Sequence, residues 1–371
     1  MPIPLLLHGT HQRPPAPPVL YEPFGPWIVP WRFGSIETEY AALRHGAGLI
    51  DSSTQAQVEC RGADRISFLH RLLTNDIARL TPGTGCPAAL LTASAKLTAP
   101  LLVLCEAETT WLLCDLPLAQ TLIRTLEQYH FSEDLTLINH ERRWAVLAVE
   151  GPQALERIGR LADSTVSLPA AFSHTTTSLR GIPVRLLRDS LIGTTGICCL
   201  VEADHAASVW QLFMQAGVTP VGWEAYHIAR IEAGIPCFGL DMDEANLLPE
   251  TGLETARCSE TKGCYLGQEI VARMQTYGSA NKRLMGLLVE GEAAPQPGDR
   301  IMQDETEVGW VTSGCSSLAL KQPIAMGYLK RGAYEPGTRV EIARANRRLA
   351  ATVANRPLVS LANTSRTPAS G

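Results

Sequence analysis

The C-terminal part of the sequence restricts the fold most, because it consists of short alternating segments divided by Pro–Gly turns. From Lys282 onward, the segments "LMGLLVEG", "DRIMQDETEVGWVTSG", "IAMGYLK" and "TRVEIARANRRLAATVA" are interrupted by "QPGD" and "EPGT". Pro–Gly pairs form tight turns, and such alternation is typical of strands with one buried face. We therefore predict a separate small β-barrel or sandwich over residues 282–355.

Residues 26–281 mix helices and strands. The stretch "GADRISFLHRLL" (Gly62–Leu73) has apolar residues at the spacing of an amphipathic helix, and "APLLVLCEAETTWLLCDL" (Ala99–Leu116) is typical of two strands joined by a turn. Because the alternation has no regular parallel repeat, it indicates an α+β region. We expect a proline-rich, extended arm over residues 1–25 and a flexible tail over residues 356–371.

Composition and charge exclude several classes of protein. The formal net charge of −5 provides no basic surface for a nucleic-acid partner. No apolar run approaches the roughly 20 residues that cross a bilayer. The N-terminal "MPIPLLLHGT" lacks the basic start of a secretory signal. We therefore predict a cytoplasmic protein that binds neither nucleic acid nor membrane.

The ten cysteines include one in an unusual setting. No CxxC pair occurs, so a structural zinc site is not expected, and we predict no bound metal. Most of the thiols lie in apolar segments, where cysteine serves as a small hydrophobic residue. Cys264, in "TKGCYLGQEIVAR", instead follows Lys262 and precedes a helix that begins at Gln268 and Glu269. Nearby positive charge and a helix N-terminus favour a thiolate, so we predict a reactive thiol on an exposed bend.

The same stretch resembles the KGC-(F/Y)-x-GQE signature of folate-binding YgfZ-type iron–sulfur cluster assembly factors, which are relatives of the glycine-cleavage T protein. Further segments follow that superfamily's order along almost the whole chain: "GLIDSS", "GADRISFLHRLLTNDI", "ARIEAGIPCFGLDMDEANLLPETGL" and "VGWVTSG". The resemblance implies a ring-like arrangement of two α+β lobes and a C-terminal β-barrel. It also implies a pocket for tetrahydrofolate near the centre of the ring.

The segment "WEAYHIARIEAGIP" is predicted to form a helix that lines this pocket. Tyr226, His227 and Arg230 share one face of the helix, because they are spaced by three and four residues. Arg230 falls where the superfamily keeps a folate-contacting arginine, and we expect Tyr226, Gln268 and Glu269 to contribute to folate binding with it. The alternative is that Arg230 is a solvent-exposed arginine on an ordinary helix.

Two departures from the aminomethyltransferases affect the chemistry that we expect. The resemblance places an aspartate pair of those enzymes at Ala99 and Pro100, which can neither accept a proton nor stabilise a cation. It also places a folate-contacting glutamate at Cys198. We therefore expect folate binding to persist and aminomethyl transfer to be absent.

These observations lead to three functional hypotheses. The first is a tetrahydrofolate-binding protein that supports assembly or repair of iron–sulfur enzymes, with Cys264 and Lys262 as its reactive residues and such enzymes or assembly proteins as partners. The alternative is a folate-dependent aminomethyltransferase or other one-carbon transferase. The third is a binding module that keeps the folate fold only as a scaffold. This reasoning favours an assembly factor without aminomethyltransferase activity over an enzyme.

Overall fold

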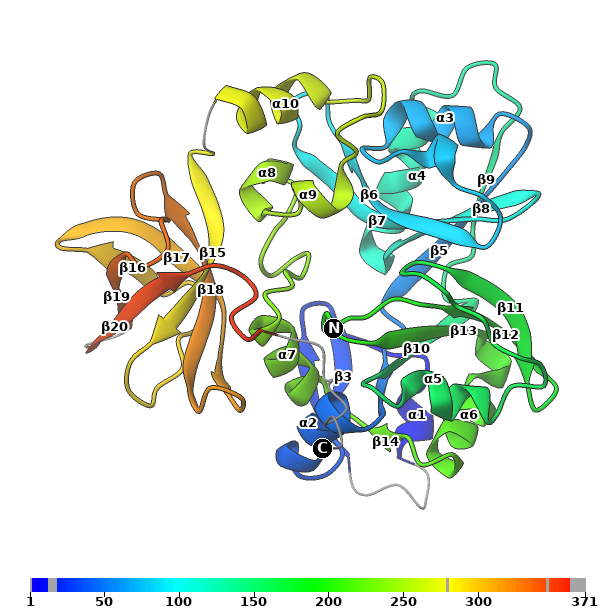
Figure 1. Cartoon of the computed structure of the whole chain (residues 1–371), viewed down its shortest axis with the longest axis horizontal. Helices are drawn as coiled ribbons and strands as arrows, with labels where there is room; N and C mark the ends of the chain where they lie inside the picture. The colour runs from blue at the N-terminus through cyan, green and yellow to red at the C-terminus, as the bar shows by residue number, and fades with distance from the viewer. Residues whose placement is uncertain (1, 13–18, 278–279, 345–346, 361–371) are drawn as a thin grey trace, which may run out of the picture.

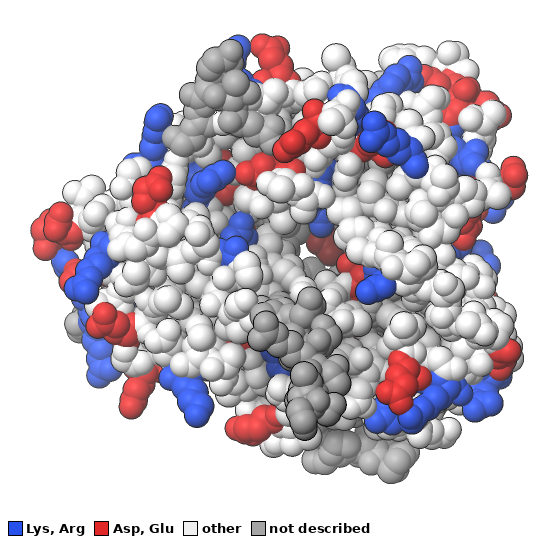
Figure 2. All heavy atoms as spheres, in the orientation of Figure 1, with Lys and Arg blue, Asp and Glu red and all other residues white. Residues whose placement is uncertain are grey.

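Three parts of the chain surround a central hollow. The computed structural model describes residues 2–12, 19–277, 280–344 and 347–360. Two α+β lobes lie on the right in Figure 1 and a β-barrel lies on the left. Figure 2 shows the hollow in the middle of the molecule, with acidic and basic side chains in its wall. The ring-like α+β arrangement with a C-terminal barrel is therefore confirmed.

The first lobe is a five-stranded sheet with helices on its outer face. The strand order is β6-β7-β8-β5-β9. Apolar residues of α3 and α4, among them Phe68 and Leu122, pack on alternate residues of the sheet such as Val58 and Leu101. The amphipathic helix predicted from "GADRISFLHRLL" is confirmed as α3. The elements are β5 (Gln55–Arg61), α3 (Arg65–Leu72), η1 (Ile77–Arg79), β6 (Thr84–Leu91), β7 (Leu97–Cys105), β8 (Thr109–Asp115), η2 (Leu116–Leu118), α4 (Ala119–Glu127) and β9 (Thr136–Asn139).

The second lobe repeats this two-layer arrangement with a six-stranded sheet in the order β11-β12-β13-β10-β4-β14. Helices α5 and α6 cover its outer face through residues such as Ile158 and Phe213. The elements are α2 (Ile36–His45), β4 (Gly48–Asp51), β10 (Trp144–Glu150), α5 (Ala154–Gly159), β11 (His174–Leu179), β12 (Ile182–Leu187), β13 (Gly196–Glu202), α6 (Ala203–Gln215) and β14 (Thr219–Pro220).

The N-terminal residues contribute to the folded body, although we expected an extended arm there. They form β1 (Ile3–Pro4), α1 (His8–His11) and β2 (Leu20–Phe24), which join β3 (Trp27–Arg32) in a small sheet of order β1-β3-β2. Leu5 and Leu7 are buried. Apolar residues around the prolines supply enough buried surface to hold these short elements. The proline-rich residues 13–18 lie outside the described residues.

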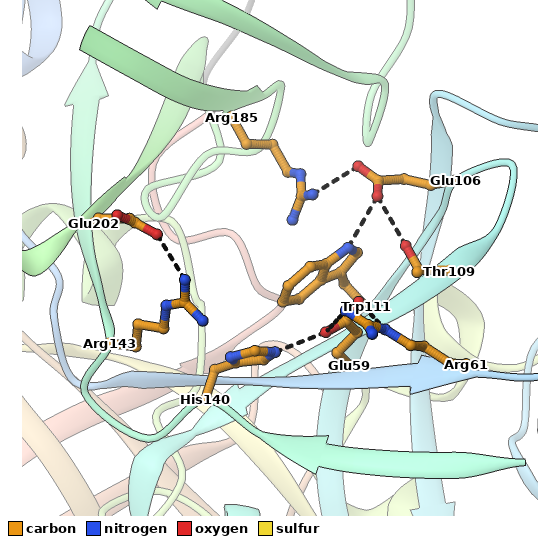
Figure 3. A network of polar contacts seen from close by, with 9 residues as sticks. All are labelled: Glu59, Arg61, Glu106, Thr109, Trp111, His140, Arg143, Arg185 and Glu202. Carbon is orange, nitrogen blue, oxygen red and sulfur yellow. Dashed lines mark hydrogen bonds and ion pairs between the residues drawn. The ribbon is translucent and has the colours of Figure 1, made fainter.

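The inner faces of the two sheets pack against each other. Leu102, Leu104 and Leu113 of the first sheet share a buried cluster with Val146 and Leu200 of the second sheet. A polar network extends this contact between the lobes (Figure 3). In it, Arg185 of β12 donates to Glu106 at 2.6 Å and lies 4.4 Å from the ring of Trp111. Apolar packing and a cross-lobe ion pair together fix how the lobes meet beside the hollow.

The chain then crosses from the lobes to the barrel through α7 (Trp223–Glu232), α8 (Leu248–Thr251), α9 (Glu254–Arg257) and α10 (Gln268–Tyr277). The predicted helices in "WEAYHIARIEAGIP" and "QEIVARM" are confirmed as α7 and α10. The barrel closes in the order β15-β18-β17-β16-β19-β20. Its strands are β15 (Lys282–Val289), β16 (Arg300–Gln303), β17 (Thr306–Ser317), β18 (Gln322–Lys330), β19 (Arg339–Arg344) and β20 (Arg347–Ala354).

The residues after the barrel return to α7. Arg356 donates to the carbonyl of Gly234 at 3.1 Å, and the amides of Leu358 and Val359 both donate to the carbonyl of Glu232 at 2.9 Å. The first residues of the expected tail are therefore packed, because they satisfy carbonyl groups at the C-terminal end of a helix. Residues 361–371 lie outside the described residues.

Candidate functional site

Five half-buried polar side chains from five different segments come together at the hollow. They come from the ends of β8 and α9, the segments after β12 and α7, and α7 itself, of which α7 and α9 border the hollow in Figure 1. The charge of Arg257 acts on both aspartates, and Asp115 in turn acts on Tyr226 and Cys237, so the group is linked electrostatically. The five are Asp115, Asp189, Tyr226, Cys237 and Arg257.

Burial dominates the electrostatics of this group. It raises the pKa of the Asp115 carboxyl to about 6, and the guanidinium of Arg257 opposes that rise. Burial raises the pKa of Asp189 as well, again against the charge of Arg257. A carboxyl with a pKa near 6 can exist in either protonation state close to neutral pH. Such a group can accept or release a proton under ordinary conditions.

Arg257 is held in place by the first sheet. Its Nη1 donates to the carbonyl of Ala88 at 3.0 Å and to that of Leu101 at 2.9 Å. Burial lowers the pKa of this guanidinium, while Asp189 and Asp115 raise it. One nitrogen is thus anchored on the strands β6 and β7, which fixes a planar cation within electrostatic range of two carboxylates.

Arg230 lies in a different environment from the one that we predicted. It is fully buried, so it is neither an exposed arginine nor open to the hollow. Its guanidinium donates to Asp241 at 2.7 Å, to Ser313 at 2.8 Å and to the carbonyl of Ile235 at 3.1 Å, while Nε donates to His227 at 3.2 Å. These contacts join α7 to the barrel strand β17. A folate contact from Arg230 stays a prediction, and its geometry favours a structural role.

Asp241 completes this buried ion pair. Besides Arg230, it accepts hydrogen bonds from Thr312 and Ser313 at 2.6 Å and from the amide of Cys237 at 2.9 Å. Burial raises the pKa of its carboxyl, but the arginine charge and these hydrogen bonds outweigh burial and hold the pKa below its usual value. The pair is therefore ionised and fully hydrogen-bonded, which is the arrangement that a buried salt bridge requires.

Lys262 is turned toward the first lobe. Its Nζ donates to the carbonyls of Leu73 at 2.6 Å, Asn75 at 3.0 Å and His70 at 2.5 Å. Burial lowers its pKa to about 8. The ammonium thus satisfies carbonyl groups at the C-terminal end of α3 and just after it. Within the described residues, Lys262 makes no hydrogen bond to Cys264. Joint action of Lys262 and Cys264 stays a prediction that this geometry does not favour.

Cys264 and the predicted residues at the start of α10 lie on an exposed turn. Cys264 is exposed. Gly267 adopts a φ of +82°, and a Cβ there would come within 2.8 Å of the carbonyl oxygen of Thr92, so the turn depends on glycine. Gln268 accepts from the amide of Tyr265 at 3.3 Å, and Glu269 pairs with Arg273 at 3.2 Å. Gln268 and Glu269 thus make local contacts, and their role in folate binding stays a prediction. Of the four predicted folate contacts, only Tyr226 belongs to the group at the hollow.

The positions that depart from the aminomethyltransferases face different environments. Ala99 belongs to the outer core beneath α3 and α4, whereas Pro100 points to the opposite face of the sheet. Cys198 is buried, and burial raises the pKa of its thiol well above the usual value. Its Sγ lies 4.0 Å from the carbonyl of Asp189. Cys198 therefore borders the group at the hollow as a neutral side chain.

Sequence reasoning missed Asp115, Asp189 and Arg257. A partial signal marked the two aspartates, because Asp115 is the last residue of an apolar strand and Asp189 lies two residues after another, in "WLLCD" and "LLRD". The two strands belong to different sheets, so only the packing of the two lobes brings these carboxylates together. No signal marked Arg257, since its significance depends on contacts with strands far away in the sequence. Within the described residues, no group of three or more His, Cys, Asp or Glu side chains is arranged to hold a metal. None of the described helices is long and apolar enough to cross a membrane.

Comparison with known proteins agrees with this architecture. The family model of the GCVT N-terminal domain matches residues 10–258, and that of the glycine cleavage T-protein C-terminal barrel domain matches residues 282–360. An aminomethyltransferase of Synechococcus sp. (strain CC9311) is 29% identical over 344 residues, covering 90% of this chain and 93% of that protein. One of Bacillus subtilis (strain 168) is 29% identical over 326 residues, covering 86% and 89%.

A solved structure shows the same fold. The glycine cleavage system aminomethyltransferase T from Bartonella henselae superposes with a TM-score of 0.85 at 22% identity, covering 96% of this chain and 98% of that one. The relatives named here are all aminomethyltransferases, which was the second of our three hypotheses, and none of them carries the narrower YgfZ-type assignment. Matches to both domain models along most of the sequence establish that the chain belongs to the glycine cleavage T-protein (GCVT) family.

Proposed function

We propose that this protein binds tetrahydrofolate in the central hollow and acts as a folate-dependent one-carbon transferase of the aminomethyltransferase type. Its family membership and the aminomethyltransferases that align over 86–90% of the chain support this activity. The observation that carries the proposal is the polar group at the hollow, in which a carboxyl with a pKa of about 6 lies beside a fixed guanidinium. Perturbed, partly accessible groups of this kind are typical of active sites.

The side chains present fit a reduced folate. In the part of the chain that the structure describes, no hydrogen-bond donor reaches the Asp115 carboxylate, whose pKa responds only to burial and to Arg257. The ring system of tetrahydrofolate carries several N–H groups, which need acceptors of this kind when they leave water. The guanidinium of Arg257 suits an oxygen of the same ligand, and Tyr226 offers a half-buried aromatic ring.

Tetrahydrofolate is expected to stabilise the purified protein, because a ligand that binds only the folded state raises its stability by mass action. At about 100 times the dissociation constant the gain is about 2.7 kcal/mol. Differential scanning calorimetry with increasing tetrahydrofolate tests binding. Consumption of tetrahydrofolate with an aminomethylated carrier protein, against a heat-inactivated control, tests transfer. Binding without turnover would exclude the transferase activity and support the folate site. Absence of binding would exclude both the activity and the site.

Cys264 supports a second candidate function, in the assembly or repair of iron–sulfur enzymes. It is exposed, whereas the other nine cysteines are buried or half-buried. A single thiolate cannot hold a cluster, which usually needs about four cysteine ligands. It can serve as a transient ligand, a persulfide carrier or a redox contact with a partner protein.

The Cys264→Ser variant separates the two candidates. If the protein is an assembly factor, cells that carry this variant should lose activity of iron–sulfur enzymes, while the purified variant should still bind tetrahydrofolate with unchanged affinity. Cys315→Ser is the matched control, because that thiol is buried in the barrel. Wild-type activity of iron–sulfur enzymes in Cys264→Ser cells would exclude the thiol from this function.

A further inference from the structure

The carboxylate missing at Ala99 and Pro100 has a spatial counterpart on the neighbouring strand. Strands β7 and β8 pair in antiparallel register, with Leu102 opposite Leu113 and Val103 opposite Leu112. The pairing ends at Leu102 and Leu113, but the same register counted two residues further along both strands brings Asp115 level with Pro100. Residues at matching positions of neighbouring strands project from the same face of the sheet.

The face in question is the inner one, toward the hollow. Along β8, Leu112 and Cys114 contribute to the outer core beneath α3 and α4, while Trp111 and Leu113 contribute to the inner cluster. Side chains alternate along a strand, so Asp115 follows Trp111 and Leu113 onto the inner face. By the same alternation on β7, Pro100 lies on the inner face with Leu102 and Leu104.

Arg257 provides independent evidence that Asp115 lies near Pro100. Its guanidinium bonds the carbonyl of Leu101, the residue that follows Pro100, at 2.9 Å. The same guanidinium acts on the carboxylate of Asp115. One cation therefore lies near both Pro100 of β7 and the carboxylate of Asp115 on β8.

We infer that Asp115 is the carboxylate that contacts the N–H groups of the bound folate in this protein, in place of the one that Ala99 and Pro100 cannot supply. The inference rests on the proposed folate site. It explains how a chain without acidic residues at positions 99 and 100 keeps an acceptor beside Arg257. Because the contact uses the ionised carboxylate, it also makes folate binding dependent on pH.

The sign of the pH dependence follows from the groups around Asp115. Burial raises its pKa to about 6 and Arg257 opposes this, while Tyr226 and Cys237, which face it from α7 and the following segment, are neutral near pH 7 because burial raises their pKa values. Asp189 shares Arg257 with Asp115. A carboxylate accepts hydrogen bonds from N–H donors, and its protonated form is a poorer acceptor. The affinity for tetrahydrofolate should therefore increase as pH rises from about 5.5 to 7.

The test compares Asp115→Asn with wild type by calorimetric titration of tetrahydrofolate between pH 5.5 and 8. We expect the affinity of the variant at pH 7.5 to fall about ten- to a hundredfold, the loss of a charge-assisted hydrogen bond. We also expect the variant to lose the rise in affinity between pH 5.5 and 7. Glu108→Gln is the matched control, since that exposed residue lies at the other end of the same hairpin and should leave both quantities unchanged.

A rescue variant distinguishes a contact from a structural effect. Adding Pro100→Asp to Asp115→Asn returns a carboxylate to the same face, and we expect it to restore most of the affinity and the pH dependence. The melting temperature of each variant reports on folding. If wild type binds tetrahydrofolate and Asp115→Asn binds it equally well at every pH, this inference is wrong and the proposed function stands. If wild type does not bind it, both fail.

Discussion

Replacing Arg230 by alanine should lower the free energy of unfolding by about 3–5 kcal/mol, because it leaves the carboxylate of Asp241 buried without its cation. Arg230 is fully buried and Asp241 is 1% exposed. The substitution also removes the hydrogen bonds through which α7 is joined to Ser313 of the barrel. Urea denaturation followed by tryptophan fluorescence measures the loss. It should exceed the effect of substitutions at exposed arginines by several fold.

Arg273→Ala is the matched control for this prediction. Arg273 forms an ion pair with Glu269 at 3.2 Å, but both side chains are exposed. Exposed pairs of this type contribute about 0.3–0.5 kcal/mol. The double variant Arg230→Ala/Asp241→Ala should be less unstable than the two single losses predict, since neither charge is then left unpaired. If Arg230→Ala costs no more than Arg273→Ala, the buried ion pair is not the joint between α7 and the barrel.

Cys264 should react with iodoacetamide at least about ten times faster than any other cysteine of the native protein. A buried thiol must wait for local opening, and an opening cost of only about 1.4 kcal/mol already slows a reaction tenfold. Cys86 and Cys237 are the two half-buried thiols, and burial raises the pKa of each to about 12, so neither forms much thiolate near neutral pH. Mass spectrometry of timed digests resolves the ten sites.

The Cys264→Ser variant provides the control for the assignment, because it should lose the fast phase and keep the slow ones. Unfolding in guanidinium should bring all remaining thiols to similar rates. If Cys86 or Cys237 reacts as fast as Cys264 in the native protein, the exposed turn does not distinguish this thiol. The second candidate function would then lose the observation on which it rests.

Much of the fold could be predicted from the sequence because the relevant signals are local. The apolar spacing of "GADRISFLHRLL" reflects a helix that buries one face, and α3 has this form. Pro–Gly turns and alternation indicated the barrel strands, but not their pairing, because β15 pairs with β18 and β16 with β19. The N-terminal residues are the exception. Prolines suggested an extended arm, but Leu5 packs beside Trp27 and Trp223, and Leu7 packs in the core of the second lobe.

The sequence by itself determined the helices and strands, the family resemblance and the exposure of Cys264. That exposure is a local property, because the glycines that flank Cys264 favour a turn. Only the tertiary structure decided which polar residues meet. Arg230 was predicted to contact folate and Lys262 to act with Cys264, yet both are buried against partners elsewhere in the chain. Nothing in the sequence linked Asp115 with Arg257, yet strand register and a contact to Leu101 bring them together. The reason is physical. The environment of a side chain depends on distant segments that pack around it, and a local sequence pattern contains no information about those segments.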